Sequence, residues 1–263
     1  MNRREGRSAQ DRNGNKMLEL AYMSIEGMND EVREVLYSCV SKERQEQLRA
    51  RKSRTSADLS LAGEALARVM LCRIVRQIEA ERMTTGACIP DDFPYSGGIA
   101  GALKAKDIRI ETAKNGKPYQ GTVPGLYFNC SHSGIMVACA VAGEEVGVDI
   151  QEVVHGIKIR AKVYCPEEKQ IDSGNDNDEF FSEVWARKES YLKLTGEGLR
   201  REMKTLNVRK MQADGEVRWY GGRLDEAYYL YACMEAEKEE VKIRKISLGE
   251  VVEFLKEQRM CEG

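Results

Sequence analysis

Apolar residues recur at three- and four-residue spacing in two long segments, which is the spacing of amphipathic helices. The first segment is residues 56–82, and its apolar positions are Leu59, Ala62, Leu66, Val69, Met70, Ile74 and Ile78. The second is residues 178–194, which ends at the glycine-rich turn 195–198. Shorter helices are predicted after Pro166, since proline suits the first helical turn, and from Ser247 onward.

Shorter apolar runs predict strands. Residues 135–142 are continuously apolar between two glycines, which predicts a buried strand, and residues 146–150 predict its neighbour across a Gly-Glu-Glu turn. Two further runs, 217–220 and 227–234, predict a strand pair joined through Gly221 and Gly222. Short strands are also predicted at 108–111 and 126–129. Strands and helices alternate without a strict βαβ repeat, which predicts an α+β fold with two similar subdomains meeting near residue 145.

Composition and charge exclude several classes of protein. A chain of 263 residues with 42% hydrophobic and 32% charged residues is typical of a globular protein with one large or two ordinary domains. The net charge of −2 argues against nucleic-acid binding, which usually requires a basic surplus. The longest apolar run, eight residues, is too short to span a bilayer, so no membrane partner is expected. Residues 1–16 are polar and arginine-rich, which predicts a disordered tail.

The cysteine and histidine content indicates the compartment. Eight cysteines are scattered without a Cys-x-x-Cys pair, and the chain has only two histidines. This pattern predicts reduced cysteines in a cytoplasmic protein and argues against a histidine-based zinc site.

Two stretches carry the candidate chemistry. Residues 147–150 predict an apolar strand that carries Asp149, and residues 185–193 predict a helix that places Lys188, Glu189 and Lys193 within one and a half turns. Singly, each has an ordinary explanation, such as a surface ion pair between Glu189 and Lys193. Together, carboxylates that hold a hard divalent cation and lysines that bind phosphate predict a magnesium-dependent reaction on a phosphate ester.

Three further motifs have both an ordinary and a functional interpretation. Residues 129–134, Asn-Cys-Ser-His-Ser-Gly, predict either a tight polar turn or a phosphate-binding nest. Residues 115–118 predict an ordinary turn when considered alone. Residues 42–54 contain six basic and two acidic residues, which is typical of a solvated helix face. An RNA-binding function for this run has little support, because it contains no aromatic residue to stack on bases.

The ordered set of motifs over residues 41–199 resembles the 4′-phosphopantetheinyl transferase superfamily, in particular its larger single-chain type. The matching segments are Leu61–Glu64, Gly116-Lys117-Pro118, Asn129-x-Ser131-His132-Ser133-Gly134, Val146–Ile150 and Trp185-Ala186-x-Lys188-Glu189-Ser190-x-x-Lys193. The last two correspond to the signature blocks of the family, so their combination is specific.

The resemblance implies two pseudo-symmetric α/β subdomains with the active site in the cleft between them. Residues 17–144 would form the coenzyme A side, and residues 145–263 would carry the metal and the catalytic helix. The implied reaction is magnesium-dependent transfer of the 4′-phosphopantetheine arm of coenzyme A to a serine of an apo acyl- or peptidyl-carrier protein. The by-product would be adenosine 3′,5′-bisphosphate. One chain would supply both walls of the cleft, so a monomer is expected.

The resemblance also assigns roles to residues. Asp149, Gln151 and Glu189 are expected to hold Mg²⁺, and Lys193 to place positive charge near the diphosphate. Glu189, directly or through a metal-bound water, is the first candidate for the base that accepts the serine proton, and Glu168 is the second. The expected coenzyme A contacts are Lys117, Pro118, Ser131, His132 and Lys188, with Arg51 and Lys52 near the 3′-phosphate.

The sequence departs from the family pattern at two positions. Gln151 stands where a second acidic residue is common, and an amide oxygen can bind Mg²⁺ directly or through water, with weaker affinity expected. Glu152 does not replace it, because neighbouring residues of a strand point to opposite faces. Leu59 stands where an arginine is common. These departures motivate an alternative function, a catalytically weakened module that binds coenzyme A or a carrier protein.

Overall fold

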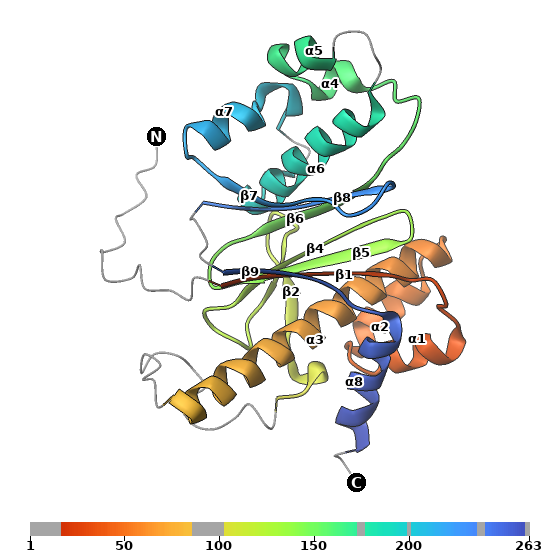
Figure 1. Ribbon diagram of the computed structural model, residues 1–263. Helices are drawn as coiled ribbons and strands as arrows, with labels where there is room; N and C mark the ends of the chain where they lie inside the picture. The colour runs from red at the N-terminus through yellow and green to blue at the C-terminus, as the bar shows by residue number, and fades with distance from the viewer. Residues whose placement is uncertain (1–16, 86–102, 173–176, 199–200, 236–239, 261–263) are drawn as a thin grey trace.

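The protein has the predicted α+β architecture. The computed structural model describes residues 17–85, 103–172, 177–198, 201–235 and 240–260, so the tail predicted for residues 1–16 lies outside the described residues. Two sheets lie face to face, and each is covered on its outer side by helices, as Figure 1 shows. In the described ranges, no helix is both long and apolar enough to cross a membrane.

The first sheet has the order β4-β5-β1-β9. Its strands are β1 (Met17–Ser24), β4 (Tyr127–Ser133), β5 (Met136–Ala142) and β9 (Glu240–Lys245). β1 lies in the interior of the sheet, antiparallel to β5 and parallel to β9. This places β4 at one edge, a position that becomes important for the candidate site.

Four helices cover the outer side of the first sheet. They are α1 (Asp30–Tyr37), α2 (Lys42–Arg49), α3 (Arg54–Thr85) and α8 (Leu248–Met260), and a small hairpin of β2 (Ile110–Thr112) and β3 (Pro118–Gln120) follows the 3₁₀ turn η2 (Ala105–Asp107). α3 confirms the helix predicted over 56–82. α8 confirms the helix predicted from Ser247, whose hydroxyl accepts from the Glu250 N–H while the Glu250 carboxylate accepts from the Ser247 N–H.

The second sheet is antiparallel with the order β6-β8-β7. Its strands are β6 (Gly147–Glu152), β7 (Arg218–Arg223) and β8 (Tyr228–Met234), and the helices on its outer side are α4 (Arg160–Val163), α5 (Pro166–Asp172), α6 (Asp178–Thr195) and α7 (Val208–Ala213), with the 3₁₀ turn η4 (Met203–Thr205). α5 and α6 confirm the helices predicted after Pro166 and over 178–194.

Burial on both faces explains why β5 and β8 are apolar throughout. One face of β5 packs against α3, and its other face meets the second sheet through Ala138 and Ala140. Small residues there let the sheets approach closely, and Val148, Ile150 and Leu230 fill the space between them. A strand covered on both sides loses the alternation of polar and apolar residues. β5 therefore confirms the buried strand predicted from the continuous apolar run 135–142.

Three predicted connections are wrong. β6 is hydrogen-bonded to β8 rather than to β5, so residues 146–150 begin a second sheet after the turn instead of extending the first. Residues 129–133 belong to β4 and form neither a polar turn nor a nest; the chain turns at Gly134. Gly221 and Gly222 lie inside β7, and the connection to β8 is formed by residues 224–227.

The chain crosses back to the first sheet near its end. The predicted division into residues 17–144 and 145–263 stays a prediction, but β9 and α8 lie with the first sheet and its helices. Neither β1 nor β9 was predicted from the sequence.

α6 packs directly on β6 because Gly147 has no side chain. A Cβ at this position would lie 2.0 Å from the Ser190 carbonyl oxygen and 2.4 Å from the Leu194 nitrogen. Both are backbone atoms of α6 that cannot move aside without displacing the helix. The glycine of the signature block is therefore required by the approach of a helix backbone to a strand.

Gly147→Ala should consequently lower the free energy of unfolding by about 3 kcal/mol or more, the upper range for overpacking a core. Urea denaturation followed by circular dichroism measures the loss. Gly121→Ala is the matched control, because no atom lies within 4 Å of a Cβ there. Equal stability of the two variants would contradict the close approach.

Candidate functional site

Asp149, Ser131 and Lys193 meet where the two sheets and α6 come together. Asp149 Oδ1 accepts from Ser131 Oγ at 2.7 Å and from Lys193 Nζ at 2.6 Å, and Lys193 Nζ also lies 2.7 Å from Ser131 Oγ. Each residue comes from a different element, namely β6, β4 and α6. The structure therefore brings together three of the residues that the sequence analysis singled out.

The second oxygen of Asp149 has no partner. Asp149 is 5% exposed, and its Oδ2 is buried without a hydrogen bond. Burial raises the pKa of this carboxyl, while Lys193 and Ser131 act in the opposite direction. Glu189, one turn before Lys193 on α6, also has a raised pKa, first because of burial, with the Asp149 charge adding to it against the effect of Lys193. The two carboxylates therefore lie close enough to repel each other.

These observations fit a divalent cation. In the described part of the chain, no cluster of three or more His, Cys, Asp or Glu side chains is present. Mg²⁺ does not need one, because it is commonly bound by one or two carboxylates with water and substrate phosphates completing its shell. A cation bound here would be a partner for the free oxygen of Asp149, and it would offset the repulsion between Asp149 and Glu189. Gln151 follows Asp149 on β6, and its amide nitrogen donates to the Glu152 carbonyl at 2.7 Å.

Lys188 and Glu168 form a separate buried pair. Lys188 is fully buried, and its ammonium donates to Glu168 Oε2 and to the carbonyls of Val163 at 2.7 Å and Met203 at 3.2 Å. Glu168, 1% exposed, also accepts from the Cys165 N–H. Burial lowers the pKa of Lys188, against the opposite effect of Glu168. This pair joins α6 to α4, α5 and η4, and its hydrogen bonds do not extend to Asp149.

A cavity of about 720 Å³ lies beside Ser131 and His132, which are among its lining residues. Its walls come from α2, α3, the β2–β3 hairpin and β4, and its lining includes Leu59, Ser60, Gly63, Pro118, Phe128, Cys130, Ser131 and His132. α3 therefore contributes wall residues even though Leu59 stands where the family often has arginine. Two of the sequence motifs contribute to this wall: Gly116-Lys117-Pro118 through Pro118, and residues 129–134 through Cys130, Ser131 and His132.

The cationic residues of the cavity wall were not among those predicted to contact coenzyme A. Arg44, which belongs to the basic run 42–54, lines the cavity with Arg68, Lys106 and Arg109, and so do the acidic residues Glu43, Glu64 and Glu111. Glu64 organises two of the cationic residues, since its carboxylate accepts from Arg44 Nε at 2.8 Å and from Arg68 at 2.8 Å. The (i, i+4) spacing of Glu64 and Arg68 in a predicted helix was the available signal, but it is indistinguishable from an ordinary helix pair.

The predicted 3′-phosphate contacts, Arg51 and Lys52, are not among the residues that line the cavity. Arg51 is exposed and donates to Ser60 Oγ at 2.6 Å and to the Ser56 carbonyl at 3.1 Å. Burial, then the charge of Lys193 and then that of Arg51 lower the pKa of His132. The lowered pKa favours the neutral imidazole, which can still donate one N–H. Lys52 is exposed.

The side chains of Lys117 and Pro118 lie in different surroundings. Pro118 begins β3 and lines the cavity, whereas the Lys117 ammonium turns toward Glu145 and donates to the Leu194 carbonyl at 3.1 Å. Leu194 lies in the last turn of α6, where a cation is favoured by the exposed carbonyls. The contact of Lys117 with coenzyme A stays a prediction.

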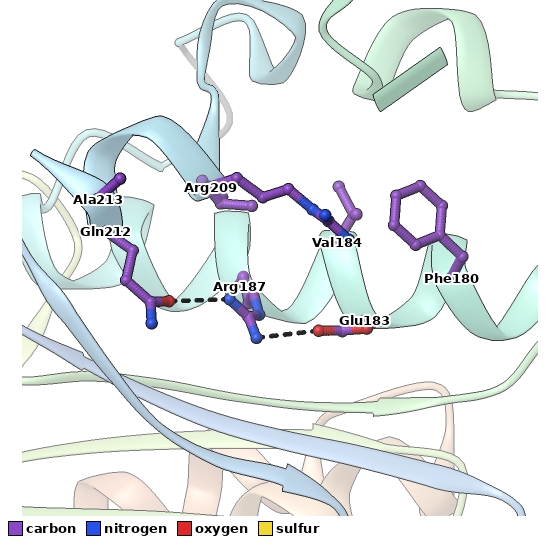
Figure 2. Close-up of a pocket in the computed structure, with 8 residues that line it drawn as sticks. Phe180, Glu183, Val184, Arg187, Arg209, Gln212 and Ala213 are labelled. Atoms are coloured by element: carbon purple, nitrogen blue, oxygen red, sulfur yellow. Dashed lines mark hydrogen bonds and ion pairs between the residues drawn. The ribbon is translucent and has the colours of Figure 1, made fainter. Parts of the chain in front are cut away.

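A second hollow lies on α6 away from these residues. Figure 2 shows it between α6 and α7, with Arg187 held by Gln212 at 3.0 Å and by Glu183 at 3.0 Å. None of the predicted site residues lines this hollow. The cavity beside Ser131 and His132 is therefore the better candidate.

Comparisons with known proteins agree with the geometry. A family model described as the 4′-phosphopantetheinyl transferase superfamily matches residues 145–242, which contain Asp149, Glu189 and Lys193. The 4′-phosphopantetheinyl transferase psf-1 of Bacillus pumilus is 30% identical over 171 residues, covering 59% of this chain and 68% of the relative. The chain belongs to the 4′-phosphopantetheinyl transferase superfamily.

Other members of the family match shorter or more divergent segments. The 4′-phosphopantetheinyl transferase Sfp of Bacillus subtilis (strain 168) is 34% identical over 119 residues, covering 44% of this chain and 53% of the relative. The 4′-phosphopantetheinyl transferase gsp of Aneurinibacillus migulanus is 28% identical over 188 residues, covering 70% of this chain and 68% of the relative. The match thus spans about half the length of Sfp and two thirds of gsp.

Breaking the buried pair should be costly. Lys188→Met leaves Glu168 charged, buried and without its cation, which typically costs about 3–5 kcal/mol of stability. The double variant Lys188→Met/Glu168→Gln removes both charges and should be more stable than Lys188→Met alone. Urea denaturation of the three proteins measures the difference. A double variant less stable than Lys188→Met would show that the pair is not the source of the loss.

Glu189→Gln should stabilise the protein at neutral pH. Because the folded state raises the pKa of Glu189 above 4.5, ionising this carboxyl costs stability above that pH and costs nothing well below it. In the presence of a chelator, the melting temperature of Glu189→Gln should therefore exceed that of the unsubstituted protein at pH 7, and the difference should shrink as the pH falls through 4.5. Glu183→Gln, on the same helix, should show no such gain; a lower melting temperature of Glu189→Gln at pH 7 would contradict the expectation.

Proposed function

We propose that this protein transfers the 4′-phosphopantetheine arm of coenzyme A to a serine of an apo acyl- or peptidyl-carrier protein, releasing adenosine 3′,5′-bisphosphate. The observation that carries the proposal is the junction of Asp149, Ser131 and Lys193, because Ser131 also lines a cavity whose wall includes arginine and lysine side chains. The chain belongs to a family whose named members are 4′-phosphopantetheinyl transferases.

The cavity is suited to the nucleotide end of coenzyme A. Three arginines and a lysine are among its lining residues, and such side chains bind phosphate by charge-assisted hydrogen bonds. Ser131 lines this cavity and donates to Asp149, so a diphosphate bound beside Ser131 would approach the carboxylates. Neutral His132 would donate a hydrogen bond to it without adding charge.

In the transfer, the carrier serine oxygen forms a bond to the phosphorus that bears the pantetheine arm. The bond from that phosphorus to the bridging oxygen breaks, and adenosine 3′,5′-bisphosphate leaves. Lys193 provides a fixed positive charge where the phosphate oxygens gain negative charge. Glu189, half-buried with a raised pKa, is the group we assign to accept the serine proton. Glu168 is less suited, because its carboxylate is enclosed with Lys188.

Asp149, Glu189 and the Gln151 amide oxygen, directly or through water, would hold Mg²⁺. A bound magnesium ion supplies neutralising charge to the diphosphate. Gln151 has one less negative charge than the common acidic residue, so we expect weaker binding of the ion and retained activity.

We further infer that the two sheets with their helices are the pseudo-symmetric halves implied by the resemblance, with the active site in the cleft between them. The supporting observation is that Ser131 and Asp149, which touch, belong to different sheets. A monomer in the cytoplasm, without nucleic-acid or membrane partners, stays the prediction.

The alternative is a module that binds coenzyme A or a carrier protein with little or no catalysis, and Gln151 is the residue that favours it. Calorimetry distinguishes the two functions. A binding module should bind coenzyme A with the same affinity with and without Mg²⁺, and should never release adenosine 3′,5′-bisphosphate.

The direct test is incubation with coenzyme A, Mg²⁺ and a panel of apo carrier proteins, followed by intact-mass measurement. We expect at least one carrier protein to gain the phosphopantetheine arm, and no gain on any member of the panel would overturn the proposal. Asp149→Asn and Glu189→Gln should each lower kcat by roughly a hundredfold to a thousandfold, as loss of a group acting on transition-state charge does.

Glu183→Gln is the matched control for these variants. Glu183 lies on α6 as Glu189 does, but its carboxylate is bound to Arg187 and Tyr231. Its activity should equal that of the unsubstituted protein. A loss as large as that of Glu189→Gln would show that the helix, rather than the carboxylate, is being perturbed.

A further inference from the structure

The two sheets are joined along one seam by side chains of β4. β4 is an edge of the first sheet and β6 an edge of the second. Asn129 Oδ1 accepts from the Val148 N–H at 3.0 Å, and Ser133 Oγ accepts from the Glu152 N–H at 3.1 Å. Between them, Ser131 donates to Asp149 at 2.7 Å. Every second residue of β4 over this stretch therefore binds β6.

The seam provides hydrogen-bond acceptors for an edge strand. Among the described strands, β6 is hydrogen-bonded only to β8, so its edge that faces β4 has no strand paired with it. β6 is paired with β8 on one side, so N–H groups on its other edge need acceptors. The oxygens of Asn129 and Ser133 take the place that carbonyls of a neighbouring strand would have. Both bonds join residues 19 apart, so β4 and β6 keep the same register at both ends of the seam.

The turn after β4 reinforces this alignment. Gly134 has a φ of 57°, and a Cβ on it would lie 2.4 Å from Tyr228 Oη and 2.6 Å from Glu152 Oε2. Tyr228 Oη in turn accepts from the Ile135 N–H at 3.4 Å and donates to Glu152 Oε1 at 3.3 Å. The end of β4 and the turn after it thus pack against residues of the second sheet.

β4 also lines the cavity. Phe128, Cys130 and His132, which alternate with the seam residues, are part of the cavity wall, and so is Ser131 of the seam. A displacement of β4 along or away from β6 would therefore move the wall of the cavity relative to Asp149 and Glu189. In a reaction that requires reacting groups to be in line, such a shift lowers the rate even when both halves of the site are intact.

We propose that Asn129 and Ser133 are positioning residues, which set the placement of the coenzyme A side of the site against the carboxylates of the second sheet. This inference rests on the proposed function. Neither residue lines the cavity, and each acts through a backbone N–H of β6. Substituting either residue should lower kcat and leave the affinity for coenzyme A unchanged.

The test compares Ser133→Ala, which removes the acceptor, with Ser133→Thr, which keeps a hydroxyl at the same position. We expect Ser133→Ala to lower kcat about tenfold with an unchanged KM for coenzyme A, as a small misplacement of reacting groups does. Ser133→Thr should restore kcat. Asn129→Ala should show the same division between kcat and KM with a larger fall in melting temperature, because Asn129 is buried.

Ser182→Ala controls for a general loss of stability, since Ser182 is a buried serine on α6 that donates only to the Asp178 carbonyl at 2.8 Å. Its kcat should equal that of the unsubstituted protein. The proposal is overturned if Ser133→Ala keeps full kcat, if it changes only KM, or if Ser133→Thr fails to restore the rate.

Amide hydrogen exchange by NMR tests the seam without any activity. The Glu152 N–H should exchange slowly in the unsubstituted protein and in Ser133→Thr, and faster in Ser133→Ala. Equal exchange in all three proteins would overturn the inference. If the unsubstituted protein modifies no carrier protein, the proposed function fails, and this measurement still decides whether the seam exists.

Discussion

The candidate site depends on a carboxylate that is buried where two sheets meet. An isolated ionised carboxylate is strongly disfavoured away from water, and it persists only when charge and hydrogen bonds compensate for the lost hydration. Here the compensation for Asp149 comes from Lys193 on the helix outside the second sheet and from Ser131 on the edge of the first. The arrangement thus depends on both sheets, and neither sheet alone provides it.

Two lysines of the signature helix show how position within one helix decides the role of a charge. Lys188 and Lys193 lie five residues apart in sequence, and the helix turns them toward different surroundings. Lys188 is enclosed by carbonyls and Glu168, where it joins helices of the second sheet. Lys193 is partly exposed and holds Asp149, where it remains accessible to a phosphate. Sequence alone treats the two as equivalent cations, because both match the motif.

The helices and strands predicted correctly share a physical reason. Long helices such as α3 and α6 show their periodicity over many residues, and strands buried on both faces, such as β5, show an unbroken apolar run. Asp149, Ser131 and Lys193 were found because their motifs occur in a specific order. β9 was missed although residues 240–245 alternate charged and apolar side chains, since six residues of that kind also suit an exposed loop. Strand partners were wrong because pairing is decided by distant segments, as in β6, which pairs with residues about 80 positions later.

The late return of β9 has a consequence for how the chain reaches its folded state. β9 supplies the parallel neighbour of β1, and more than 200 residues separate the two strands. The first sheet is therefore incomplete until β9 has left the ribosome, although its other strands, β1, β4 and β5, are synthesised earlier. Closing so long a loop is slow, because its entropy must be lost before the new contacts form. During synthesis the β1 edge would be open to other strands, so the emerging chain is exposed to mispairing until β9 and α8 arrive.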